Sequence, residues 1–276
     1  MSPASLLTCE LQQEEFTKIC TVMHRLCGIT LRPGKESLVK ARLMRRLSAL
    51  GLDSFDAYLT YVERDASGKE LIAMIDVLTT NKTSFFRESQ HFTYLRDMIV
   101  PQLLQTPQPI RLWSAGCSSG EEPYTLAMVL REAIPDIDRR DVRILATDIS
   151  TSVLAAARQA VYDQDVVHDI PQPLLQKYFT KVREKPVPAF QAKETLRKMV
   201  QVARLNLMHN WPMRGPFDAI FCRNVMIYFD KPTQEWLAQR YWELLRPGGH
   251  LFIGHSESLS TASHTFHYVQ PALYRK

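Results

Sequence analysis

The stretch 113–124, WSAGCSSGEEPY, holds residues whose types and spacing could do chemistry. Its G-C-S-S-G core, residues 116–120, fits the G-x-S-x-G pattern of a hydrolase nucleophile elbow. The same residues could form a glycine loop that admits a cofactor between a strand and a helix. Ser118 is therefore either a nucleophile, with Asp218 and His255 following in Ser-Asp-His chain order, or part of the wall of a ligand site.

The position of this loop favours the cofactor interpretation. An elbow serine sits after several strands, whereas PIRLWSAG, residues 109–116, is the first predicted strand here. The loop lacks the Lys-Ser or Lys-Thr of a P-loop. Glu121 and Glu122 open the next helix, where two carboxylates repel phosphate and attract a cation or sugar hydroxyls. A positively charged nucleoside without phosphates, such as S-adenosylmethionine, fits this description.

Further polar side chains stand at the ends of the predicted strands. Asp148 ends VRILATD, where an acid can accept both ribose hydroxyls, and Asn206 and Asn224 follow later strands. Two of the acids have alternatives. Glu122 stands three residues after Ser119, so the pair could be only a capping box, and Asp148 could be only the N-cap of the following helix.

Secondary structure must position these side chains, and the chain shows two different sequence patterns along its length. Residues 10 to about 78 show helical spacing, with helices predicted over 14–27 and 35–50 and C-cap glycines at Gly28 and Gly51. After about residue 108, short apolar runs alternate with helical stretches, which predicts a parallel sheet covered on both faces. The expected strands are PIRLWSAG, VRILATD, MVQVARLN, FDAIFCRN and HLFIGHS.

We therefore expect an α/β protein: a small all-helical N-terminal domain, then a doubly wound, Rossmann-like domain. The predicted domains are 1–78 for the helices, 79–107 for a linker and connecting helix, and 108–276 for the sheet. The proline-interrupted stretch at about 172–198 is either an inserted antiparallel element or a long loop.

Bulk properties are those of an ordinary globular chain, with 276 residues, 45% hydrophobic and 23% charged. The five cysteines form no C-x-x-C pair, so we expect free thiols in a reducing cytoplasm. The first residues lack a basic region followed by an apolar run, and no stretch is apolar enough for a membrane helix. These features predict a cytoplasmic protein without direct membrane insertion.

Several long motifs together resemble the chemotaxis receptor methyltransferases, the CheR family, over nearly the whole chain. They are LTTNKTSFFRESQHF, WSAGCSSGEEPYTLAM, ATDIS, FDAIFCRNVMIYFD and LRPGGHLFIGHSES. The resemblance implies a class I methyltransferase fold for the sheet domain. It also implies transfer of a methyl group from S-adenosyl-L-methionine to glutamate carboxylates of chemoreceptors, which gives γ-methyl esters and S-adenosyl-L-homocysteine. No metal is implied.

The resemblance also implies roles for individual residues. Arg87 and Tyr228 correspond to the family residues nearest the transferring methyl, and Glu122 rather than Glu121 corresponds to the family's ligand. Tyr228 could instead be an aromatic plug under the sheet edge. The implied cofactor contacts are Asn81, Thr83, Arg87, Glu122, Asp148, Asn206, Leu207, Arg223 and Asn224.

A basic segment is the predicted docking site for an acidic partner. Between Arg32 and Arg46 there are six basic residues and one acid, in a chain whose net charge is +5. On a helical wheel Arg42, Arg45 and Arg46 fall on one flank beside an apolar stripe, so we expect them to face outward. Glutamate-rich receptor helices are the predicted partner, with a solvated basic face as the alternative. Nucleic acid binding is not expected, and we expect a monomer.

Overall fold

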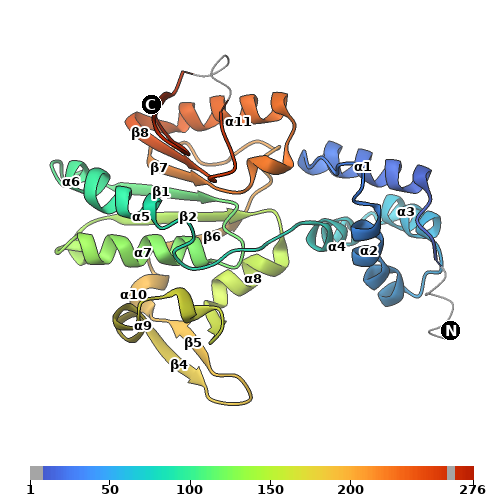
Figure 1. Cartoon of the computed structure of the whole chain (residues 1–276), viewed down its shortest axis with the longest axis horizontal. Helices are drawn as coiled ribbons and strands as arrows, with labels where there is room; N and C mark the ends of the chain where they lie inside the picture. The colour runs from blue at the N-terminus through green and yellow to red at the C-terminus, as the bar shows by residue number, and fades with distance from the viewer. Residues whose placement is uncertain (1–8, 260–264) are drawn as a thin grey trace.

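The computed structural model describes residues 9–259 and 265–276. Residues 1–8 and 260–264, which fall in the predicted first and third domains, lie outside the described residues. The chain forms a helical part and a larger α/β part, which lie side by side and are joined by the extended segment after residue 78 (Figure 1).

Among the described residues, the helical part has four helices around one apolar core. The predicted C-cap glycines are confirmed, since Gly28 and Gly51 both adopt left-handed backbone conformations with φ of 71° and 68°. Ser54 caps the third helix by accepting a hydrogen bond from the backbone N–H of Ala57 at 3.2 Å. The helices are α1 (Gln13–Cys27), α2 (Glu36–Leu50), α3 (Phe55–Arg64) and α4 (Lys69–Leu78).

The α/β part contains a seven-stranded sheet with the order β6-β2-β1-β7-β8-β10-β9. The five predicted strands are all present and pair in parallel. The antiparallel pair at the C-terminal edge, β9 and β10, was not predicted. The strands are β1 (Ile110–Ala115), β2 (Val142–Asp148), β6 (Val200–Arg204), β7 (Phe217–Cys222), β8 (Leu245–Ile253), β9 (His267–Gln270) and β10 (Leu273–Arg275).

Alternating side chains of the strands fill one core on each face of the sheet. Leu112 of β1 packs in the core that α7 covers, whereas its neighbour Trp113 points into the core that α11 covers. Each face is therefore protected by helices, as a parallel sheet requires (Figure 1). The flanking helices are α5 (Gln90–Tyr94), which continues through η2 (Leu95–Ile99) into α6 (Val100–Leu103), then α7 (Glu121–Ala133), α8 (Thr151–Gln159) and α11 (Lys231–Leu244).

The proline-interrupted stretch is an antiparallel element and not a long loop. Its three strands pair in the order β3-β5-β4, and the first of them, β3, precedes the predicted start at residue 172. The insert consists of β3 (Val161–Asp163), α9 (Gln172–Tyr178), β4 (Phe179–Arg183), β5 (Ala189–Ala192) and α10 (Glu194–Arg197). Within the described part of the chain, no helix is both long and apolar enough to span a bilayer.

Candidate active site

A cavity of about 670 Å³ lies between the helical part and the carboxyl edge of the sheet. This volume suits a ligand of nucleoside size. It lies where the strand order reverses, since Gly116 follows β1 and Asn224 follows β7 on either side of the reversal. The cavity brings together the predicted cofactor and reaction residues, Asn81, Thr83, Arg87, Glu122, Asp148, Asn206, Leu207, Arg223, Asn224 and Tyr228.

The two glycines of the loop after β1 are packed closely against protein side chains, and Gly116 also lines the cavity. Gly116 has φ of 93°, and a Cβ there would lie 2.4 Å from Cγ2 of Val225. Gly120 has φ of 102°, and a Cβ there would lie 2.8 Å from the Tyr162 hydroxyl. Both positions require glycine because protein atoms and a left-handed backbone leave no room for a side chain.

Ser118 is part of the cavity wall and has no catalytic triad. Its hydroxyl donates a 2.8 Å hydrogen bond to the backbone carbonyl of Asn81. Asp218, the acid of the hydrolase alternative, accepts from the backbone N–H of Arg111 at 2.7 Å, at the start of β1 and β7. Ser118 follows the other end of β1, so the hydrolase interpretation is excluded by the positions of the two residues.

Asp148 ends β2, and backbone donors hold its carboxylate beside the glycine loop. Oδ2 accepts from the N–H of Ser118 at 2.9 Å, and Oδ1 accepts from the N–H of Ser150 at 3.0 Å. The cap of α8 is Ser150 and not Asp148, because the Ser150 hydroxyl accepts from Val153. Burial raises the pKa of Asp148, and the two backbone donors oppose that shift. Its carboxylate is thus left for a ligand with hydroxyl donors.

Glu122 forms an internal ion pair and not a capping box. Its side chain accepts from the Ser114 hydroxyl at 2.7 Å and from Nη1 of Arg223 at 2.9 Å. Ser119 instead donates to Glu121, which is buried and does not line the cavity. Burial raises the pKa of Glu122, and the Arg223 guanidinium opposes that shift. A carboxylate in this position attracts the positive charge of a sulfonium nucleoside.

The two strand-end asparagines line the cavity, and each donates a hydrogen bond to another protein group. Asn206 donates from Nδ2 to the backbone carbonyl of Leu26 at 2.6 Å, which ties the sheet to the helical part. Asn224 donates from Nδ2 to Glu88 at 3.4 Å and has φ of 59°. A positive φ at an asparagine costs little compared with bulkier residues.

The segment after α4 forms the wall opposite the glycine loop. Arg87 donates from Nη1 to the carbonyl of Lys82 at 3.0 Å, so its guanidinium lies against its own loop. The Tyr228 hydroxyl donates to the carbonyl of Thr80 at 3.4 Å from the other side of the cavity. The same tyrosine's carbonyl accepts from the N–H of Thr30 at 2.8 Å, so helical part, segment and sheet meet here.

Two carboxylates that order the site were missed in the sequence. Glu88 accepts from Arg223 at 3.0 Å and from Asn224, and it has φ of 56°. Glu257 accepts from the backbone N–H groups of Asn224 and Ile227, both at 3.0 Å. Each lies in one of the motifs that carry the family resemblance, FFRE and HSES, so those motifs could have indicated both residues. Phe85 of the first motif is core, with its ring centroid 5.0 Å from that of Tyr162.

The predicted outward orientation of the arginine flank on α2 is wrong for two of its three members. Arg42 donates to the carbonyls of Leu78 and Thr79 at 2.8 and 3.0 Å and so caps the end of α4. Arg46 forms a two-bond pair with the buried Glu70, at 2.9 and 2.6 Å. Only Arg45 of the three is exposed.

Two family models, together with the fold and the cavity, define an S-adenosylmethionine-dependent methyltransferase. Residues 14–79 match the family described as "CheR methyltransferase, all-alpha domain", and residues 81–274 match "CheR methyltransferase, SAM binding domain". The chain therefore belongs to the CheR methyltransferase family.

Curated relatives cover almost the whole chain. A "Chemotaxis protein methyltransferase" of Borreliella burgdorferi is 40% identical over 98% of this chain and 96% of its own length. A "Chemotaxis protein methyltransferase 2" of Pseudomonas aeruginosa is 43% identical over 95% of this chain and 92% of its own. The "Chemotaxis protein methyltransferase" of Escherichia coli is 39% identical over 93% and 88%.

Proposed function

We propose that this enzyme transfers the methyl group of S-adenosylmethionine to glutamate side chains on the cytoplasmic domains of chemoreceptors. The observation that carries the proposal is the single cavity in which the family-matched residues of both parts of the chain meet. The names of the relatives support chemoreceptors as the substrates. We further propose that Arg87 and Tyr228 act on the acceptor, and that the other predicted residues hold the cofactor.

The chemistry needs alignment more than acid–base catalysis. A glutamate carboxylate has a free pKa near ~4.3, so it is already a nucleophile at neutral pH. S-adenosylmethionine, when bound, supplies an activated methyl group on a sulfonium leaving group. The protein's task is to hold the carboxylate in line with that methyl and to remove water from it. Arg87 has one hydrogen bond to its own loop, so the rest of its guanidinium can aim the carboxylate loosely.

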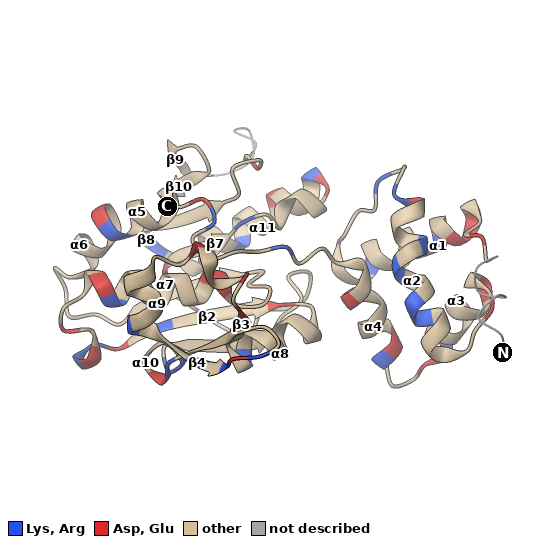
Figure 2. Cartoon of the chain, turned by 60° about the horizontal axis from the view of Figure 1, so that its bottom comes forward, with Lys and Arg blue, Asp and Glu red and all other residues tan. Residues whose placement is uncertain are grey.

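The mouth of the cavity has the chemistry to receive an acidic amphipathic helix. Arg32, Lys35 and Lys82 line it and are exposed. Two large apolar side chains also line it, Leu38 from α2 at 42% exposure and Ile227 after β7 at 38%. Basic groups around exposed apolar side chains complement a helix that carries both glutamates and apolar residues. Figure 2 marks the basic residues of this helical part in blue.

The division of labour between the parts is also a proposal. We assign receptor recognition mainly to residues 1–78, and cofactor binding to 108–276 together with Asn81 and Thr83 of the segment 79–107. The enzyme would act as a monomer in the cytoplasm, where the acceptor helices are, without nucleic acid or membrane insertion.

Methyl transfer to a defined receptor fragment tests the proposal. Purified enzyme and labelled S-adenosylmethionine would be incubated with a cytoplasmic chemoreceptor fragment and with the same fragment carrying glutamine at every methylation position. Label that enters the first fragment only, and leaves as methanol in base, supports a glutamate γ-methyl ester. Cofactor binding without any transfer would instead indicate a nucleoside sensor. Absence of both cofactor binding and methyl transfer would overturn the assignment altogether.

A further inference from the structure

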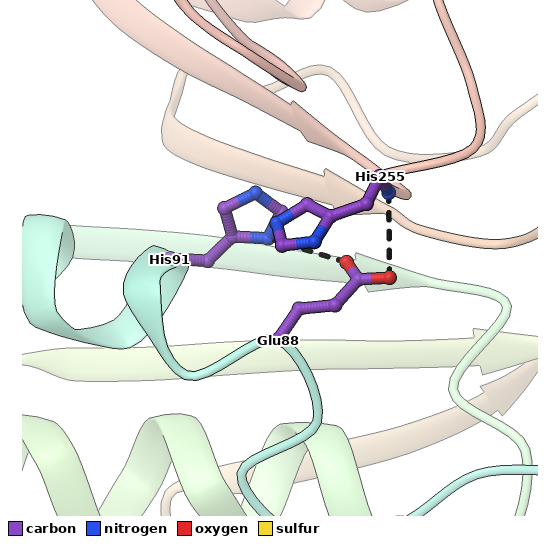
Figure 3. Close-up of side chains that lie close together, drawn as sticks. All are labelled: Glu88, His91 and His255. Atoms are coloured by element: carbon purple, nitrogen blue, oxygen red, sulfur yellow. Dashed lines mark hydrogen bonds and ion pairs between the residues drawn. The ribbon is translucent and has the colours of Figure 1, made fainter.

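Three metal-ligating side chains meet beside the cofactor cavity and take no part in the proposed reaction. They are Glu88, His91 and His255, and their ligand atoms all lie within 4.8 Å of one another. Figure 3 shows the two imidazoles facing the carboxylate from opposite segments, one in the first turn of α5 and one after β8.

His91 supplies an independent sign that the cluster has a missing partner. Its side chain is 1% exposed, and within the described residues neither ring nitrogen has a hydrogen-bond partner. The nearest carboxylate oxygen, Oε2 of Glu88, is 3.7 Å from Nδ1, which is beyond a hydrogen bond. A buried imidazole with two unpaired nitrogens is costly, and a bound ion would satisfy one of them.

The charges around the cluster also favour a cation. Arg223 is 2% exposed and lies between the carboxylates of Glu88 and Glu122, at 3.0 and 2.9 Å. One guanidinium therefore faces two carboxylates, which leaves one negative charge in excess when both are ionised. His255 is exposed, so an ion can enter from solvent without opening the core.

We propose that Glu88, His91 and His255 form a binding site for a divalent transition-metal ion of the zinc class. Two imidazoles and one carboxylate are a common donor set for such ions, and an open position would remain for water. The reaction itself needs no metal, so the site would be regulatory. An ion on Glu88 would compete with Arg223 and Asn224 for the same carboxylate oxygens. The ion would therefore loosen the cofactor cavity and weaken cofactor binding.

Cobalt titration of the full chain without a polyhistidine tag tests the site directly. Co²⁺ is the probe, because its visible absorption reports imidazole and carboxylate coordination, and Zn²⁺ should displace it. We expect one Co²⁺ per chain, and we expect His255→Gln to raise its Kd at least about tenfold. His255 is exposed, so this variant should fold; His267→Gln, on exposed β9, is the matched control and should bind as wild type does.

Absence of a one-to-one Co²⁺ spectrum would overturn the site, as would equal loss of binding in His267→Gln and His255→Gln. The effect of the ion on cofactor binding is measured separately, by calorimetry of S-adenosylhomocysteine binding with and without Zn²⁺. Weaker binding with Zn²⁺ in wild type but not in His255→Gln supports it. Unchanged binding in wild type at saturating Zn²⁺ would show that Glu88 keeps Arg223 and would remove the regulatory role.

Discussion

Arg223 donates a 2.9 Å hydrogen bond to Glu122, and the two side chains are only 2% and 13% exposed. The pair joins the loop after β7 to the first turn of α7 across the reversal of strand order. A charge pair with so little water around it depends on both partners, because either one alone is left desolvated. The cofactor cavity is thus held in shape by charges that also face its ligand.

Removal of Arg223 should destabilise the protein as well as its site. Arg223→Met leaves Glu122 and Glu88 without their cation, and we expect a loss of about 3–5 kcal/mol in unfolding free energy. Urea denaturation of both proteins without cofactor measures this loss of unfolding free energy. Adding Glu122→Gln should recover part of the loss. A single variant as stable as wild type would show that water replaces the guanidinium.

Asp148 should matter for cofactor affinity. Asp148→Ala leaves ribose hydroxyls without their acceptor, and we expect S-adenosylhomocysteine binding to weaken by roughly 1.5–3 kcal/mol in calorimetry. Asp141→Ala is the matched control, since Asp141 precedes the opposite end of the same strand and is exposed. Equal affinity in the two variants would remove Asp148 from the site.

Arg87 should affect turnover more than cofactor affinity. Its guanidinium lies at the cavity wall with one bond to the Lys82 carbonyl, so its loss misplaces the acceptor carboxylate. We expect Arg87→Ala to lower kcat about 10–100-fold while the Kd of S-adenosylhomocysteine changes little. Steady-state methylation and calorimetry separate the two effects. If affinity falls and kcat stays, Arg87 is a cofactor ligand only.

Receptor docking is best tested through Arg45, because Arg42 and Arg46 hold the helical part together. Arg45→Glu should slow receptor methylation about three- to tenfold at low ionic strength, and the difference should shrink as salt is added. Arg64→Glu reverses an exposed arginine on α3 and serves as the control. Identical methylation rates for both variants at low salt would show that Arg45 lies on a solvated surface with no role in docking.

His250 should make folding stability depend on pH. It is 4% exposed, and burial, with Arg275 nearby, lowers its pKa from 6.5 to about 4. The unfolded chain therefore binds a proton in this window that the folded chain excludes, so stability is full above about pH 6.5 and falls as pH drops toward 4. Between pH 6.5 and 4, the lowered pKa of His250 reduces the free energy of unfolding by about 3 kcal/mol. The free energy of unfolding, measured with urea at several pH values in this range, should depend less steeply on pH for His250→Phe than for wild type. Equal dependence on pH in the two proteins would contradict the assignment.

Much of this architecture could be predicted from patterns of single residues. Gly28 and Gly51 marked helix ends, and the apolar runs marked five parallel strands, because these signals are local. The edge strands β9 and β10 have only four and three residues, and they gave no such run. The start of the insert was missed for a similar reason, since β3 has only three residues and two are exposed.

Glu122, Asp148, Asn206 and Asn224 were found from their positions at strand and helix ends, and the other site residues were found by resemblance. The partners of these residues were not found. The helical wheel placed Arg42 and Arg46 beside an apolar stripe, but it could not show that α4 would supply carbonyls and Glu70 for them. Glu88 escaped notice because its importance comes from Arg223, which is 135 positions away in the chain. Contacts of this kind join residues far apart in the chain and exist only in the folded protein.

The segment after α4 is held from both sides, which limits how this enzyme can recombine with its relatives. Arg42 fixes its first carbonyls from the helical part, and Ser118 fixes the carbonyl of Asn81 from the sheet. A chimera joined within residues 82–87 would take Ser118 and the carbonyl of Asn81 from different parents, whereas a junction between Thr80 and Asn81 keeps Arg42 and Ser118 each with its acceptor. A working crossover should therefore leave Asn81 with the sheet and the residues before it with the helical part.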